Sequence, residues 1–160
     1  MMARRPRRGA LALALALAMT PACDDAAVTP LTLRLIDDVP ACPVLQLGAV
    51  VSVELVAIGA TRDGADCQLA RACLAVARSG TLAGLEAELA AAPQPVLDVS
   101  TASLSRIRVR GFPQQGCAGE VGLCGIGDPA RSADGQLEVP VVCDGRLASR
   151  CPTDALPACP

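Results

Sequence analysis

Period-two alternation of apolar and polar residues predicts β-strands at several places along the chain. It is found at residues 31–35, 50–58, 96–99, 103–110 and 136–143. Successive side chains of a strand point to opposite faces, so each segment would have one apolar face for a core and one polar face for solvent.

A short helix is predicted at residues 81–91. Its apolar positions are three leucines at helical spacing, Leu82, Leu85 and Leu89. Thr81 is a suitable N-cap, and Pro93 ends the pattern. Residues 68–78 fit both a strand and a helix, and the sequence does not decide between them.

The remaining segments have the composition of turns and loops. Residues 61–66 (TRDGAD) predict a turn, and residues 112–135, which are rich in Gly, Pro and Ser, predict a long loop. Pro140 cannot donate to a ladder of hydrogen bonds, so its strand is expected at a sheet edge or next to a bulge. Five or six strands with one short helix predict a mainly β fold, specifically an antiparallel β-sandwich.

The first 22 residues are predicted to be an export signal. Its positive start consists of four arginines, Arg4, Arg5, Arg7 and Arg8. Residues 9–19 form an apolar core, and residues 20–22 are small and suited to cleavage. The apolar core rises only about 16 Å as a helix, which is too short for a ~30 Å hydrocarbon layer. Three further parts are expected after the signal: a tether (23–30), a β-sandwich domain (31–143) and a Cys-rich tail (144–160).

Nine cysteines in an exported chain indicate an oxidising compartment, and the odd number leaves one over. Cys23 directly follows the small residues of the signal. Residues 19–23 (MTPAC) resemble a bacterial lipobox, at which a Cys receives a diacylglyceryl group before cleavage. The resemblance implies that Cys23 is a lipid anchor that attaches the protein to a membrane. Cleavage after Ala22 without a lipid is the alternative, because Thr20 stands where Leu is usual.

The other cysteines are expected to form four structural disulfides. They are Cys42, Cys67, Cys73, Cys117, Cys124, Cys143, Cys151 and Cys159. No CxxC motif is present, which argues against a redox site or a zinc knuckle. Eight cysteines allow 105 pairings. Short spacing favours Cys117–Cys124 and Cys151–Cys159 as local pairs.

The second half of the chain is similar in pattern to a known class of envelope domain. Residues 104–112 (LSRIRVRGF), the two cysteines that follow and residues 137–143 (LEVPVVC) resemble the end of immunoglobulin-like β-sandwiches in predicted bacterial lipoproteins. The resemblance covers about a quarter of the chain. It implies a fold and an envelope location, and no activity.

Composition argues against most kinds of catalysis and against nucleic-acid binding. The chain has no His, Trp or Tyr and one Phe, and all 14 of its basic residues are Arg. Imidazole-based nucleophiles and Lys-dependent phosphate or Schiff-base sites are therefore excluded. Removal of residues 1–22 takes away four of the basic residues and none of the 16 acidic ones, so the mature chain would be near −6. An acidic chain without aromatic platforms is a poor ligand for nucleic acid. No enzyme activity, metal or cofactor is expected.

Arg106, Arg108 and Arg110 alternate along one predicted strand and would share one face, about 7 Å apart. As a functional feature, this stripe is a possible anion-binding site, because Arg matches carboxylate and phosphate groups. The competing interpretation is an ordinary polar strand face whose charges pair with Glu138 or other acids across the sheet.

The sequence therefore predicts an exported, lipid-anchored module of the bacterial cell envelope, held on the periplasmic side or at the cell surface. It would bind or support an unknown envelope protein or polysaccharide, presenting loops and chiefly residues 112–135. The alternative is a secreted, disulfide-rich inhibitor or a small carboxylate-based hydrolase.

Overall fold

The computed structural model describes residues 32–38, 41–92, 99, 103–131, 135–143, 147, 151 and 155–160. The predicted export signal, the tether with Cys23, almost all of the predicted strand 96–99 and much of the predicted tail lie outside the described residues. Within these ranges the protein is mainly β.

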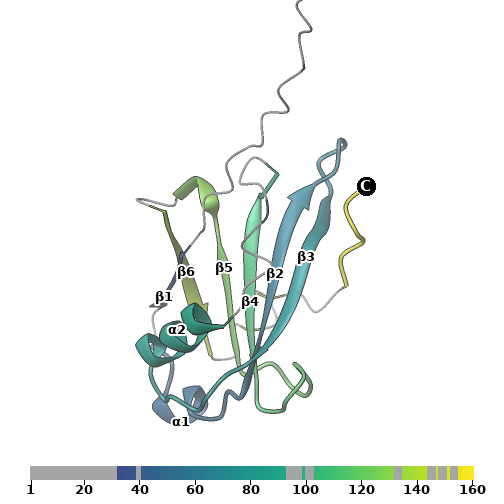
Figure 1. Ribbon diagram of the computed structural model, residues 1–160. Helices are drawn as coiled ribbons and strands as arrows, with labels where there is room; N and C mark the ends of the chain where they lie inside the picture. The colour runs from purple at the N-terminus through teal and green to yellow at the C-terminus, as the bar shows by residue number, and fades with distance from the viewer. Residues whose placement is uncertain are drawn as a thin grey trace, which may run out of the picture.

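Among the described residues, six strands form a single sheet; one helix lies over a face of the sheet and a second, single-turn helix lies at one end of it (Figure 1). The order of strands across the sheet is β1-β6-β5-β4-β2-β3. The strands are β1 (Thr32–Asp37), β2 (Ser52–Ala60), β3 (Asp66–Ala75), β4 (Arg106–Phe112), β5 (Leu123–Gly127) and β6 (Gln136–Val142).

Antiparallel pairing in the centre of the sheet follows the alternation in the sequence. β2 pairs with β3 on one side and with β4 on the other. The ambiguous residues 68–78 belong largely to β3, because pairing with β2 fixes them as a strand. The turn between the two strands is the one predicted at 61–66, and Gly64 supplies a positive φ of 84° there.

The edge pair makes the sheet mixed, because β1 runs parallel to β6 with Thr32 opposite Gln136 and Asp37 opposite Val141. The predicted antiparallel immunoglobulin-like sandwich is therefore not confirmed. A parallel pair needs a long crossover, and the whole chain between β1 and β6 supplies it. Alternation shows which residues face a core but not which strands become neighbours.

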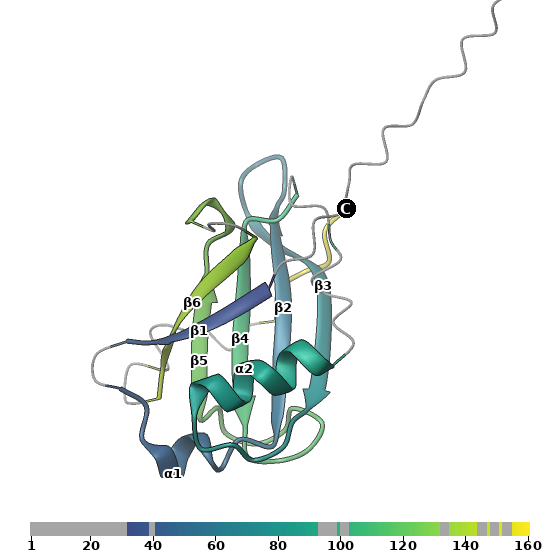
Figure 2. The same ribbon diagram turned by 60° about the vertical axis from the view of Figure 1, so that its left-hand side comes forward.

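The sheet is open and strongly curled, so β1 and β6 fold over the inner face of the central strands (Figure 2). The close approach is evident at Gly125 of β5, where a Cβ atom would lie 2.7 Å from Cγ1 of Val139. Together with helix α2 this pair encloses the core. Its fully buried members include Val53, Leu55, Ala57, Ile107, Val109, Leu123, Leu137, Val139 and Val141.

Helix α2 (Leu82–Ala91) confirms the predicted helix. The Thr81 side chain accepts a hydrogen bond of 3.1 Å from the backbone N–H of Gly84, as an N-cap should. Leu85 and Leu89 are buried in the core. The carboxylate of Glu86 accepts a hydrogen bond from the backbone N–H of Leu35, which ties the helix to the edge strand β1.

Three features differ from the sequence predictions. The predicted loop 112–135 contains strand β5 and a short 3-10 turn, Pro129–Arg131. A single-turn helix, α1 (Val44–Leu47), precedes β2. Pro140 does not lie in an edge strand, because β6 lies between β1 and β5. β5 pairs with β6 only at Val141 and Val142, so Pro140 falls outside that ladder.

Four disulfides are formed, as expected, but they join distant parts of the chain. The pairs are Cys42–Cys143, Cys67–Cys159, Cys73–Cys117 and Cys124–Cys151. The predicted local pairs are wrong, because loop geometry and not sequence spacing decides which sulfurs meet. Cys117 folds back to β3, whereas Cys124 lies on β5 with β4 and β2 between them.

Candidate binding surface at the α1 end of the sheet

One end of the sheet carries helix α1 and the loop 113–122 between β4 and β5, and we call it the α1 end (Figure 1). The β2–β3 turn lies at the opposite end. Strands β1 and β6 both run toward the α1 end, because β1 leads into α1 and the Cys42–Cys143 disulfide joins the segments that follow them.

Loop 113–122 is exposed along most of its length but is held at several points. The fully buried Ser52 hydroxyl donates a hydrogen bond of 2.5 Å to the carbonyl of Gln114 and accepts one of 3.0 Å from the N–H of Cys117. Cys117 is also bonded to Cys73 of β3. At the far side of the loop, the N–H of Gly122 donates to the carbonyl of Gly111 over 2.9 Å. The loop is therefore presented in one arrangement.

The backbone of this loop is tightly turned. Gly116 and Gly119 have positive φ angles of 73° and 90°, and Cys117 has a φ of 55°. A left-handed conformation costs a residue with a Cβ roughly 1–2 kcal/mol. The disulfide and the Ser52 hydrogen bonds hold Cys117 in this conformation.

A groove of about 500 Å³ lies beside the loop, which is within the usual range of ligand sites. Its walls are mostly apolar, and Gln46 and Glu120 are the polar side chains among its described lining residues. The lining consists of Gln46, Ala49, Val50, Pro113, Glu120, Val121, Gly122, Cys143 and Leu147. The Gln46 amide donates a hydrogen bond of 2.9 Å to the carbonyl of Gly122, which connects α1 to the loop across this groove.

Helix α1 exposes two consecutive apolar side chains next to the groove. Leu45 is 90% exposed and Val44 is 68% exposed, whereas Leu47 of the same turn is buried in the core. They are the only exposed large hydrophobic residues among those the structure describes. Single exposed apolar residues are ordinary, but this pair adjoins an apolar groove.

A buried ion cluster lies on the outer face of the sheet, the face turned away from the core. Glu54 is fully buried, and its carboxylate accepts a hydrogen bond of 2.6 Å from Nε of Arg110. Nη2 of Arg71 lies 2.5 Å from the other carboxylate oxygen. In the strand register, Cys73 lies opposite Glu54 and Cys124 lies opposite Arg110, so a disulfide-bonded cysteine flanks the ion pair on each side.

The predicted arginine stripe does lie on one face, but most of it is occupied within the fold. Arg108 is 4% exposed and the side chain of Arg110 is 11% exposed. Burial lowers the pKa of the Arg108 guanidinium, and Arg110 and Arg71 lower it further while Glu54 opposes them. Only Arg106, with 43% of its side chain exposed, is open to a ligand.

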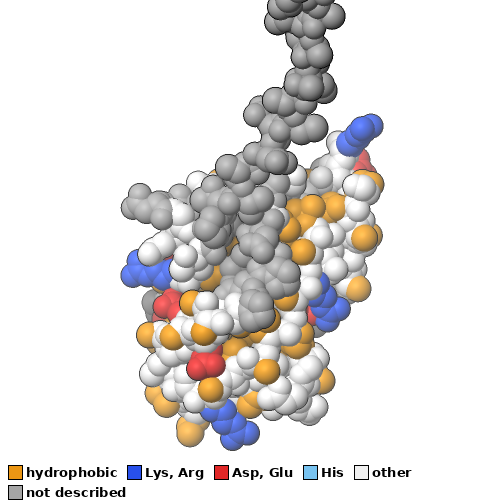
Figure 3. Space-filling model, viewed as in Figure 1, with side chains coloured by type: hydrophobic (Ala, Val, Ile, Leu, Met, Phe, Trp, Pro, Cys, Tyr) orange, Lys and Arg blue, Asp and Glu red, His pale blue; other side chains and the backbone are white. Residues whose placement is uncertain are grey.

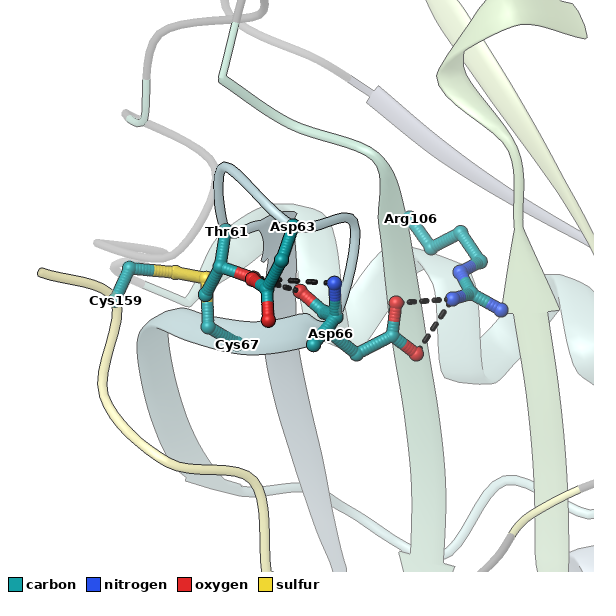
Figure 4. Close-up of a disulfide and its surroundings, with 7 residues drawn as sticks. Thr61, Asp63, Asp66, Cys67, Arg106 and Cys159 are labelled. Atoms are coloured by element: carbon teal, nitrogen blue, oxygen red, sulfur yellow. Dashed lines mark hydrogen bonds and ion pairs between the residues drawn. A yellow bond between two sulfur atoms is a disulfide. The ribbon is translucent and has the colours of Figure 1, made fainter.

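Arg106 itself pairs with Asp66, donating a hydrogen bond of 2.5 Å to Oδ2 and a second one to Oδ1 (Figure 4). The acids that pair with the stripe are therefore Glu54 and Asp66. Glu138, which the sequence suggested, pairs instead with Arg34 across β1 and β6 at 3.2 Å. The alternative of an anion-binding stripe stays a prediction and is confined to the Arg106 end.

The Cys67–Cys159 disulfide joins residues 155–160 to the start of β3, at the end of the sheet opposite to α1 (Figure 4). Gln68 and Ala158 pair as a parallel bridge beside it. In the adjacent turn the Thr61 hydroxyl donates to the Asp63 carboxylate, and this hydrogen bond lowers the pKa of Asp63.

Charged side chains on the face shown in Figure 3 form separate spots and no continuous patch of one sign.

Three comparisons with known proteins found no relative. The chain matches no protein-family model, and the curated proteins and solved structures compared with it show no significant similarity. Within the described ranges, no helix is both long and apolar enough to cross a membrane.

Part of this surface was predictable from the sequence. Loop 113–122 lies within the segment predicted to be presented, and its cysteine was predicted to be bonded. Leu45 was missed because a single helical turn is too short to produce a periodic pattern. The burial of Glu54 was not predicted, because it is a polar residue of the alternating segment 50–58 and the polar face of such a strand normally faces water.

Proposed function

We propose that this protein is an exported, lipid-anchored binding module of the bacterial cell envelope, and that it presents its α1 end to a partner. It performs no catalysis. The observation that carries the proposal is the cysteine pairing: all eight cysteines from Cys42 onward are used in disulfides, and only Cys23 is left over. An oxidising location and a separate task for Cys23 account for both facts.

The direction of the chain supports the presentation of the α1 end. Thr32 begins β1 at the end of the sheet away from α1. A tether of residues 24–30 reaches at most about 25 Å. An anchor on Cys23 would therefore keep the opposite end near the bilayer and leave the α1 end directed away from it. The immunoglobulin-like sandwich forms no part of this proposal, because the described strands make one open sheet.

Membrane fractionation of a bacterial host tests the proposal. The full chain and its Cys23→Ser variant are expressed and their envelope fractions compared after washing with high salt. The full chain is expected in the membrane fraction, and the variant in the soluble periplasmic fraction or retained with an uncleaved signal. The Cys42→Ser/Cys143→Ser variant, which loses two cysteines but keeps Cys23, is the matched control and should remain in the membrane fraction. A full chain that is soluble and carries a free Cys23 would contradict the proposal.

The exposed loop 113–122 favours a second candidate function, that of a secreted inhibitor. Inhibitors present rigid, exposed loops that are ordered before binding, which lowers the entropy cost of association. Loop 113–122 meets this description through Cys117 and Ser52. Gln115 is an exposed residue of this loop. Inhibition of secreted proteases that is lost in the Gln115→Asp variant would support this candidate, and failure to inhibit any protease of a broad panel would exclude it.

A further inference from the structure

The groove at the α1 end defines the chemistry of its occupant. Its described walls come from Ala49, Val50, Pro113 and Val121 among other apolar groups, and they would receive an apolar side chain. Glu120 is the only ionisable side chain among the described lining residues, and it is exposed. Among the described residues, an occupant that fills the groove therefore meets apolar walls and the negative charge of Glu120.

The apolar surface does not stop at the groove. Leu45 directly precedes the lining residue Gln46 in helix α1, and it is 90% exposed. A small molecule seated in the groove would leave Leu45 and Val44 in water. A protein segment crossing the groove would cover them as well, because contact of an extended segment continues beyond one pocket.

The surface is also ordered before it is occupied. The Cys42–Cys143 disulfide fixes the segment that leads into α1, and Gln46 is hydrogen-bonded to Gly122 of the loop. Cys117 holds the other part of the loop through β3. A preformed surface loses little conformational entropy on binding.

We propose that the α1 end docks a segment of a partner protein in which a large apolar side chain stands next to Lys or Arg. The apolar side chain enters the groove and covers Leu45, and the cation meets Glu120. Opposite charge at the rim of an apolar contact contributes to specificity for the partner and raises the rate of association. This inference rests on the proposed binding function and names the partner's chemistry.

Selection from a random octapeptide library displayed on phage tests the inference, with the purified full chain as the target. Sequences that combine a large apolar residue with Lys or Arg are expected to be enriched. The Glu120→Arg variant should enrich Asp or Glu in place of the basic residue. Glu138→Arg, which reverses an exposed charge on β6 away from the groove, is the matched control and should select the same peptides as the unchanged protein. Reduced and unreduced masses of each variant establish that all four disulfides have formed.

The affinities of one enriched peptide for two variants then separate the contribution of the charge on Glu120 from that of the apolar contact with Leu45. Glu120→Gln should weaken binding about threefold, the usual effect of one exposed ion pair. Leu45→Ser should weaken it about tenfold, because a contact that buries much of a Leu side chain is lost. No enrichment, or an enriched set that Glu120→Arg leaves unchanged, overturns the inference. Either result leaves the proposed lipid anchor intact, since membrane attachment through Cys23 is measured separately by fractionation.

Discussion

The carboxylate of Glu54 on β2 is fully buried and accepts a hydrogen bond of 2.6 Å from Nε of Arg110 on β4, on the face of the sheet away from the core. The guanidinium of Arg110 also lies 5.8 Å from the centre of the Phe112 ring, within the range of a cation–π contact. The outer face is thus partly buried as well, because Glu54 and Arg108 on its central strands are nearly inaccessible to solvent.

Replacement of Glu54 by Gln is expected to lower the free energy of unfolding by about 3–5 kcal/mol. The reason is that a buried cation, Arg110, loses the charge that compensates it. Urea unfolding monitored by far-ultraviolet circular dichroism measures the effect.

Glu138→Gln is the matched control, because Glu138 pairs with Arg34 while 51% of its side chain is exposed. Exposed ion pairs contribute less than about 1 kcal/mol. Equal losses in the two variants would show that Glu54 is not buried in the folded protein.

Gly125→Ala is expected to destabilise the fold by about 1–3 kcal/mol, the usual cost of overpacking. A Cβ at this position would lie 2.7 Å from Val139 and 2.8 Å from the carbonyl oxygen of Pro140. Gly122→Ala tests the same substitution where the nearest atom lies 4.0 Å away, and it should leave stability nearly unchanged. Comparable midpoints of thermal unfolding for the two variants would contradict the close crossing of β6 over β5.

Proteolysis of the unreduced protein followed by mass spectrometry should yield four cross-linked peptide pairs, Cys42–Cys143, Cys67–Cys159, Cys73–Cys117 and Cys124–Cys151. Each arises because the fold brings the two Cα atoms to between 4.9 and 6.1 Å. Recovery of Cys117 linked to Cys124 would refute the path of loop 113–122.

The pKa of Asp63 is expected to lie below its ordinary value, chiefly because the carboxylate accepts a hydrogen bond from Thr61. A lowered pKa means that this contact supports the β2–β3 turn at neutral pH and is lost as the pH falls through the lowered value. Carboxyl chemical shifts measured by NMR over an acid titration report it directly. Thr61→Val should move the pKa of Asp63 back toward the ordinary value, and an unchanged titration would exclude the Thr61 contact as the cause.

The strands with strong alternation, and helix α2 with its Thr81 cap, were predictable because local pattern and burial agree there. Strand β5 was not, since its core-facing positions after Leu123 are Gly125 and Gly127 and carry no apolar signal. Those glycines are required because β6 crosses so closely. The parallel pairing of β1 with β6 and the disulfide partners depend on contacts between distant segments, which one sequence does not encode in its spacing.

The candidate surface was predictable only in part for the same reason. A Gly-rich loop with a disulfide-bonded cysteine, Cys117, was predictable from the sequence. The groove was not, because it exists only where Val50 of one segment meets Val121 and Leu147 of two others. The arginine stripe was recognised, but its buried partner Glu54 was not, since nothing in the sequence of β2 shows that its polar face is covered.

The intact mass of the protein purified from the membranes of a bacterial host shows whether Cys23 carries a lipid. We expect a chain that begins at Cys23 and carries an added acyl mass on its N-terminal peptide. We also expect a gain of about 8 Da on reduction, two hydrogens for each of the four disulfides. A chain that begins at Cys23 without added mass and with one free thiol would contradict the lipid anchor and the function built on it.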